Sequence, residues 1–135
     1  MLLVGAAVFS ADYGKVSAAK MCRSIMVKGM EALLCEAMLT ARQYGVEDTV
    51  LLSLTDLLPG PDWEKLAPYM ISRSIKHGAR RAEEMHEVAK TVIDAGLDLL
   101  MSVACAHRQL WADKRINKPG SADMHAMLDA LIKTI

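Results

Sequence analysis

The sequence predicts an all-α domain of about six helices arranged around one long central helix. The first observation is the stretch 16–43, which has no proline, one glycine and a dense run of the strong helix formers Ala, Met and Leu. The second is that apolar residues after residue 10 recur at helical spacing, without a further strand candidate. A chain of 135 residues is long enough to bury a core in one such domain.

The N-terminal residues differ from the rest. Residues 1–13 are assigned as a remnant strand or connector, and residues 14–135 as the helical domain. The first nine residues, MLLVGAAVF, are apolar but have neither a basic leader nor a cleavage-site pattern, and they are too short to span a bilayer. No other stretch approaches transmembrane length, so we expect no membrane partner.

The central helix is expected to begin with a cap at Ser17 and to end at Gly45 in a left-handed conformation. Its first half carries a polar stripe at three- and four-residue steps, which we expect to face a cleft or a partner: Ser17, Lys20, Arg23 or Ser24, Lys28 and Glu31. Residues 32–41 are apolar nearly all round, which predicts a segment surrounded by protein. Gly29 is expected to mark a close helix crossing, because glycine is costly inside a helix.

Five further helices are expected from apolar spacing and from capping and breaking residues, over 48–58, 63–76, 79–95, 97–114 and 121–133. The second of these contains Pro68 as a kink or a restart. In the fourth, one face is expected to carry Leu100, Val103, Ala104, His107 and Trp111. The last should be capped by Ser121 and bury Ala122, Met124, Met127, Leu128, Leu131 and Ile132.

Charge and cysteine content limit the class of function. The formal net charge is zero, which argues against nucleic acid as a partner. Cys22, Cys35 and Cys105 are odd in number and lack CxxC or Cys/His spacing. They are therefore interpreted as reduced thiols packed as small apolar groups in a cytoplasmic protein, not as disulfides or metal ligands. No metal site is expected.

Lys20 is the first candidate for chemistry, since it lies within one helical turn of Arg23 and Ser24. A lysine held partly out of water beside another cation has a lowered pKa and can exchange a proton with a substrate hydroxyl. The alternative from spacing alone is a solvated lysine on the polar stripe.

A second cluster of cations stands at 77–81, where His77, Arg80 and Arg81 could bind a carboxylate or phosphate at a helix start. The alternative is that both arginines pair with nearby glutamates on a solvated face. His107 is interpreted as a core-flanking histidine, and His86 and His125 as isolated surface histidines.

Taken together, three stretches resemble the C-terminal helical domain of 6-phosphogluconate dehydrogenase-like proteins in the β-hydroxyacid dehydrogenase superfamily. They are Gly14 to Ser24, then KGMEALLCEAMLTARQYGV, then PGPDWEKLAPYMISRSIKHGARRAEEM. The resemblance covers about residues 14–115. Gly14 and Lys20 match the glycine and the lysine of the family motif. Val16 and Ser24 depart from it, standing where many members have a second glycine and a substrate-binding asparagine.

The resemblance implies roles for five residues. Lys20 would be the general acid/base, Arg23 and Ser24 would bind substrate, and Arg80 or Arg81 would counter its carboxylate. The substrate would be a small anionic hydroxy acid and the cofactor NAD or NADP. The family binds this cofactor on a Rossmann domain that these residues lack, so the chain alone is not expected to be active. The family also implies a homodimer. Segment 32–41 gives an independent reason for one, although burial within a single protomer would explain that segment as well. The alternative is a non-enzymatic helical dimerisation module.

Overall fold

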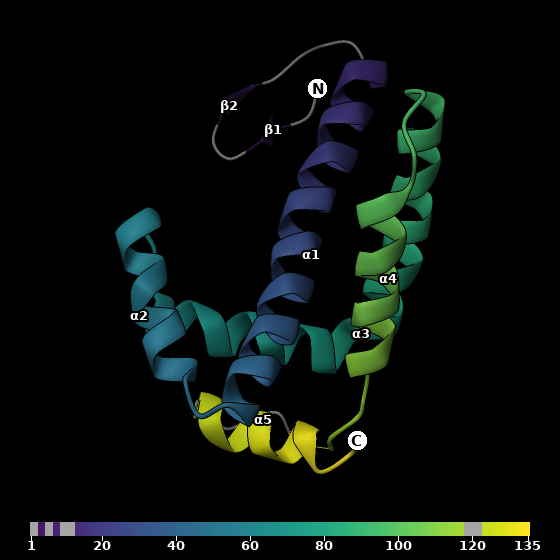
Figure 1. Ribbon diagram of the computed structural model, residues 1–135. Helices are drawn as coiled ribbons and strands as arrows, with labels where there is room; N and C mark the ends of the chain where they lie inside the picture. Colours follow the sequence, from purple (N-terminus) through teal and green to yellow (C-terminus); the bar gives the residue numbers. More distant parts are fainter. Residues whose placement is uncertain (1–2, 5–6, 9–12, 118–122) are drawn as a thin grey trace.

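The computed structural model describes residues 3–4, 7–8, 13–117 and 123–135. Within these residues the fold is all-α, apart from a minimal hairpin (Figure 1). The elements are β1 (Leu3–Val4), β2 (Ala7–Val8), α1 (Tyr13–Gln43), α2 (Glu47–Leu57), α3 (Trp63–Asp94), α4 (Leu100–Ala112) and α5 (Met124–Ile132). In the described part of the chain, no helix combines the length and apolar character needed to cross a membrane.

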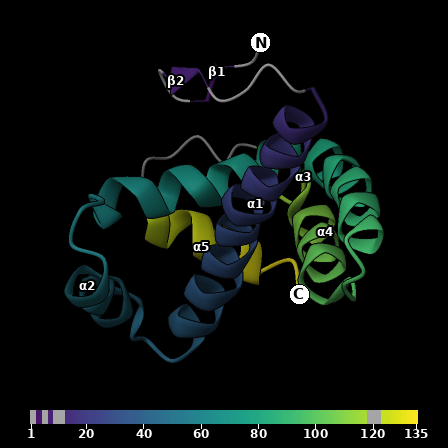
Figure 2. The same ribbon diagram turned by 90° about the horizontal axis from the view of Figure 1, so that it is seen from above.

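The helices pack around α1, as the sequence predicts (Figures 1 and 2). The second half of α3 runs beside α4 on one side of α1, while α2 stands on the other side and α5 lies across the far end of α1. The stretch expected as a remnant strand or connector contains β1 and β2, which pair antiparallel with Leu3 opposite Val8.

Two apolar cores hold the helices together. The larger lies around the far half of α1 and is built from Leu34, Cys35, Met38, Leu39, Leu51, Trp63, Ala67, Ile71, Ile75, Met124, Met127, Leu128 and Leu131. The smaller lies between α1, α3 and α4 and is built from Ala32, Ala82, Met85, Val88, Cys105 and Ala106. The predicted apolar set of the last helix is confirmed at Met124, Met127, Leu128 and Leu131.

The ends of α1 agree with the sequence at one terminus only. Gly45 has φ of +69° and follows the helix end, as expected. The expected start is wrong, because α1 begins at Tyr13 and Ser17 lies inside it rather than capping it. Burial of residues 32–41 is also incomplete, since the Leu33 side chain is 56% exposed.

The two helices expected over 63–76 and 79–95 form one helix, α3, kinked at His77 (φ −131°, ψ 21°). Pro68 is buried within the helix, and it is His77, not Pro68, that has non-helical backbone angles. At the kink the Ile75 carbonyl accepts a hydrogen bond from the Lys114 backbone N–H at 2.8 Å. The end of α4 therefore packs into the bend of α3.

The close helix contact expected at Gly29 occurs at Gly78 instead. A Cβ at Gly29 would meet no atom within 4 Å. A Cβ at Gly78 would clash with the Gln109 carbonyl oxygen and lie 2.8 Å from Asp113 Cβ. Glycine at 78 thus allows the backbones of α3 and α4 to approach closely.

The face of α4 on which the sequence places Leu100, Ala104 and His107 is exposed at these three positions, so His107 does not flank the core as expected. The buried side chains of this helix are small or polar: Ser102, Cys105, Ala106, Gln109 and Ala112. Small side chains are required on the inner face because α4 lies so close to α3, and this leaves larger apolar side chains of α4 outside.

The last helix begins with a cap at Asp123, whose Oδ1 accepts the His125 backbone N–H at 3.0 Å. Ser121 and Ala122, expected as cap and apolar residue, lie outside the described residues.

Candidate functional site

The polar stripe of α1 passes from solvent into the protein interior. Lys20 and Arg23 are exposed near the start of the helix and Ser24 is half-buried. Two turns further on, Lys28 Nζ lies 2.9 Å from Glu84 Oε2, and Glu31 is buried against α3. The last residues of the stripe therefore contact α3, whereas Lys20, near its beginning, is exposed at the surface.

Lys20 and Ser24 stand four residues apart, so they lie on the same side of α1. Neither residue lines either of the two cavities described below. These helices alone therefore do not hold the Lys20 amine out of water.

Arg80 and Arg81 have different surroundings although they are adjacent. Arg80 is exposed and its Nε lies 3.6 Å from Glu84 Oε1 within the same helix. Arg81 is largely buried, with its Nε 2.9 Å from Glu31 Oε2 of α1. Arg80 thus pairs with a nearby glutamate on a solvated face, which is the alternative to anion binding that the sequence offers. Arg81 instead connects α3 to α1 inside the domain.

The surroundings of Glu31 form a buried polar cluster between α1, α3 and α4. Burial raises the pKa of Glu31, while the nearby charges of Arg81, Lys28 and Arg73 partly offset that rise. Gln109 is fully buried and donates from Nε2 to the Lys28 carbonyl oxygen at 3.1 Å. This cluster fixes the register of three helices, and it takes Arg81 out of reach of a ligand at the surface.

His77 stands at the kink of α3 among cations. Desolvation lowers the pKa of His77, and the charges of Arg73, Arg80, Arg81 and Lys76 lower it further. Of the three groups expected to bind an anion, His77 is thus held toward its neutral form and Arg81 is paired with Glu31, which leaves Arg80 as the exposed cation.

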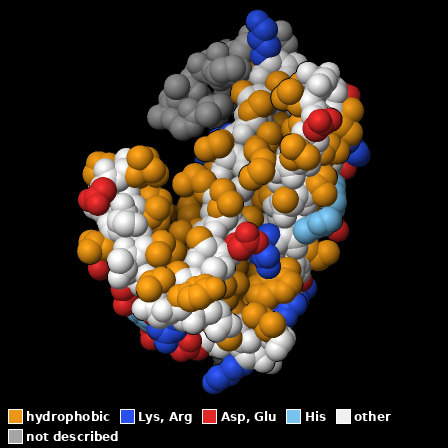
Figure 3. Space-filling model, viewed as in Figure 1, with side chains coloured by type: hydrophobic (Ala, Val, Ile, Leu, Met, Phe, Trp, Pro, Cys, Tyr) orange, Lys and Arg blue, Asp and Glu red, His pale blue; other side chains and the backbone are white. Residues whose placement is uncertain are grey.

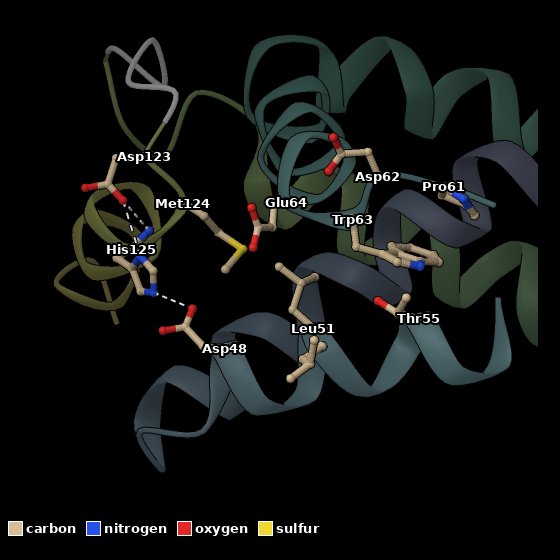
Figure 4. A pocket seen from close by; sticks show the side chains of 11 residues that line it. Asp48, Leu51, Thr55, Pro61, Asp62, Trp63, Glu64, Asp123, Met124 and His125 are labelled. Atoms are coloured by element: carbon tan, nitrogen blue, oxygen red, sulfur yellow. Dashed lines mark hydrogen bonds and ion pairs between the residues drawn. The ribbon is translucent and has the colours of Figure 1, made fainter. Parts of the chain in front are cut away.

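The larger of the two cavities described here, about 550 Å³, lies elsewhere, between α2 and the first turns of α3 and α5 (Figure 4). It has an apolar floor that includes Leu51, Trp63 and Met124, and an acidic rim. Its polar lining residues are Asp48, Thr55, Asp62, Glu64, Asp123 and His125.

His125 lies between carboxylates at the edge of this cavity (Figure 4). Its Nε2 lies 2.8 Å from Asp48 Oδ1 and 3.6 Å from Glu47 Oε1, and its Nδ1 lies 3.3 Å from Asp123 Oδ1. Burial lowers the pKa of His125, but the hydrogen bond and charge of Asp48 outweigh it and the net shift is upward. His125 is therefore not the isolated surface histidine that the sequence suggests.

A second hollow, of about 250 Å³, is mainly apolar and lies between α1 and α4. Its lining includes Met26, Gly29, Leu33 and Met101, of which the three larger side chains are exposed. The space-filling view shows apolar side chains gathered over α1 and α4 (Figure 3).

The sequence does not reveal this group of carboxylates around His125, because its parts are far apart along the chain. Glu47 and Asp48 precede His125 by more than 70 residues, and no motif spacing connects them. Asp123 and His125 are close to each other, but an isolated Asp-x-His pattern is common around helix caps.

Comparisons with known proteins agree with the fold. A family described as a domain of unknown function, DUF1932, matches residues 41–111. The "Uncharacterized 28.5 kDa protein in 7S RNA 5'region" of Methanothermus fervidus is 30% identical over 94 residues, which cover 70% of this chain and 37% of that protein.

A solved structure, of a conserved hypothetical protein from Sinorhizobium meliloti 1021, is 37% identical with a TM-score of 0.82. The match covers 92% of this chain and 42% of the other. The chain thus spans about two fifths of the length of these relatives. Because the family match extends over more than half of the chain, this protein belongs to the DUF1932 family.

Proposed function

We propose that this chain is the substrate-binding and dimerisation domain of an NAD(P)-dependent hydroxyacid dehydrogenase of the 6-phosphogluconate dehydrogenase-like kind. Family membership carries the proposal, since DUF1932 is a C-terminal helical domain of such proteins. The position of Lys20 on the exposed first turns of α1 is compatible with it. The relatives extend well beyond the matched region, which leaves room for a cofactor domain in proteins of this kind.

In this proposal the catalytic pocket is completed by atoms outside the described helices. Lys20 accepts the proton of the substrate hydroxyl, and Ser24, one turn along the same face, hydrogen-bonds the substrate. NAD or NADP, bound by a Rossmann domain, supplies the hydride chemistry. Closure of that domain over α1 would remove Lys20 from water, which is the condition for a lysine to act as a base near neutral pH.

Of the two arginines, Arg80 is the better candidate for the substrate carboxylate. It is exposed, and its ion pair with Glu84 of the same helix is long, at 3.6 Å. Arg81 is held by Glu31, and moving it to a ligand would leave a buried carboxylate without its partner. Arg23 is exposed one residue before Ser24 and is assigned to substrate orientation.

The decisive experiment uses a protein in which a dinucleotide-binding domain precedes these residues. Lys20→Ala should lower kcat by at least about 100-fold with little change in KM, as expected for loss of a general base. Lys15→Ala, which removes an exposed lysine from the same helix, should leave kcat within a few-fold. Equal activity of the two variants would rule out the role of Lys20.

A second candidate function, a helical association module without catalysis, is favoured by the exposed apolar hollow between α1 and α4. Calorimetry with NAD and NADP separates the two. In the dehydrogenase proposal, the cofactor binds the protein that carries the added domain and not these residues alone. If it binds neither, the association function is the better account.

A further inference from the structure

The strongest feature that the proposed function does not use is the group of Glu47, Asp48 and His125. One potential ligand atom from each lies within 4.8 Å of those of the other two. Glu47 and Asp48 begin α2 and His125 is in the first turn of α5, so the group joins two elements that are distant in sequence.

The spacing of these atoms suits a small divalent cation. Ligands about 2.0–2.2 Å from a tetrahedral ion lie roughly 3.3 Å from one another. His125 Nε2 stands 2.8 Å from Asp48 Oδ1 and 3.6 Å from Glu47 Oε1, values on either side of that spacing. Small side-chain movements would admit an ion between them, with Glu47 binding it through Oε2 because Arg42 holds Oε1.

The second ring nitrogen of His125 faces a carboxylate, as is usual for histidines that bind metals. Its Nδ1 faces Asp123 Oδ1 at 3.3 Å, and the same carboxylate oxygen accepts the His125 backbone N–H at 3.0 Å. A carboxylate on the second ring nitrogen fixes the imidazole tautomer and turns the first nitrogen toward a metal. Figure 4 shows this order, with His125 between Asp123 and Asp48.

An independent observation comes from Glu47. Its side chain is only 6% exposed, and Oε2 makes no hydrogen bond in the described residues. Buried carboxylate oxygens are normally satisfied, so an oxygen without a partner needs an explanation. The other oxygen, Oε1, is held by Arg42 Nη1, while Arg42 Nε and Nη2 bind Asp129 at 2.7 and 2.8 Å.

The charge balance favours a cation despite the nearby guanidinium. Within the described part of the chain, Arg42 is the cation that contacts the group directly. Four carboxylates lie within the group or beside it: Glu47, Asp48, Asp123 and Asp129. Two carboxylate ligands and one imidazole also match borderline divalent ions such as Zn²⁺ better than Ca²⁺ or Mg²⁺.

We propose that Glu47, Asp48 and His125 form a Zn²⁺-type divalent metal site that clamps the start of α2 to the start of α5. Asp48 and His125 also line the large cavity, so water from the cavity can complete the coordination. The site lies on α2 and α5, away from Lys20, and its test is independent of the dehydrogenase proposal.

Calorimetric titration with Zn²⁺ is the direct test, carried out in a Cys22→Ser background because Cys22 is an exposed thiol that could bind zinc by itself. We expect saturable binding of one ion per chain and a rise in Tm. His125→Gln should weaken binding by at least about tenfold, and His86→Gln, at an exposed histidine of α3, should leave it unchanged. Circular dichroism checks that each variant is folded.

Asp123→Asn serves as a second variant. Asparagine still caps α5 but loses the charge that orients His125, so affinity should fall by roughly tenfold while the helix is kept. Replacing Zn²⁺ by Co²⁺ should give the visible absorption of a low-coordinate site in the parent protein and not in His125→Gln. Absence of saturable binding, or binding that His125→Gln leaves unchanged, would overturn the proposal.

Discussion

Arg81 of α3 and Glu31 of α1 form an ion pair inside the domain, with Nε 2.9 Å from Oε2 and side chains only 11% and 4% exposed. Arg80, the neighbouring residue, is exposed and pairs with Glu84 of its own helix. These two arginines are adjacent on α3, yet Arg81 connects two helices while Arg80 faces solvent.

Removing the buried partner should be costly. Arg81→Ala leaves the Glu31 carboxylate buried without its counter-ion, and we expect the free energy of unfolding to fall by about 3–5 kcal/mol. Arg80→Ala is the matched control and should change it by no more than about 0.5 kcal/mol. Urea unfolding followed by circular dichroism measures both, and similar losses in the two variants would contradict the assignment.

The two mid-helix glycines should respond in opposite directions to the same substitution. Gly78→Ala places a Cβ against the Gln109 carbonyl and should destabilise the protein by at least about 2 kcal/mol, because α4 must move away. Gly29→Ala meets open space and should stabilise it by up to about 1 kcal/mol through helix propensity. Thermal unfolding of the two variants tests this, and destabilisation by Gly29→Ala would disprove it.

Gly29 and Gly78 also show which features of the fold can be predicted from the sequence. Helix propensity, apolar spacing and glycine punctuation identify the all-α class, the long central helix and the buried face of α5, because these depend on local pattern. The sequence does not show which glycine another helix crosses, since that depends on how α4 returns to α3. The same limit applies to the buried face of α4, where close packing selects Ser102 and Ala106 over Leu100. The break expected between 76 and 79, by contrast, follows from the local pattern and appears as the kink at His77.

Among the candidate residues, too, some features follow from local pattern and others depend on contacts between distant parts of the chain. The spacing of Lys20 and Ser24 along one helix follows from the sequence, as does the local pairing of Arg80. The burial of Arg81 and the grouping of His125 with Asp48 both need contacts between residues 50 or more positions apart, which no single-sequence pattern encodes.

His77 should make stability depend on pH in a defined direction. Desolvation and the surrounding cations lower its pKa in the folded state below the ordinary value of about 6.5. The unfolded chain therefore binds a proton on His77 that the folded chain does not. The stabilising contribution is complete above about pH 6.5 and is lost as the pH falls through the folded pKa.

The comparison of parent and variant isolates this contribution from other histidines. His77→Gln should flatten the fall in the free energy of unfolding below pH 6.5. Arg80→Gln should move the pKa of His77 back toward its ordinary value, as followed by NMR titration of the imidazole protons, because one neighbouring cation is lost. An unchanged titration in Arg80→Gln would show that the arginine does not act on His77.

The cysteines should differ in reactivity. Cys22 is exposed, contrary to the expectation that all three thiols are packed inside, whereas Cys35 and Cys105 are buried as expected. Burial raises the pKa of each buried thiol to about 11, so at neutral pH both are protonated as well as shielded. A maleimide should modify one thiol rapidly in the native protein and all three in urea. Cys22→Ser should abolish the rapid phase.

The exposed apolar side chains on α1 and α4 should drive self-association. Leu33, Met26 and Met101 line an apolar hollow between α1 and α4, as expected if a second copy of the chain packs there. Leu33→Glu should therefore shift sedimentation from dimer to monomer. Leu57→Glu adds the same charge at an exposed leucine of α2, outside this hollow, and should leave the dimer intact. A parent protein that sediments as a monomer at high concentration, or a dimer that survives Leu33→Glu, would show that this surface does not form the interface.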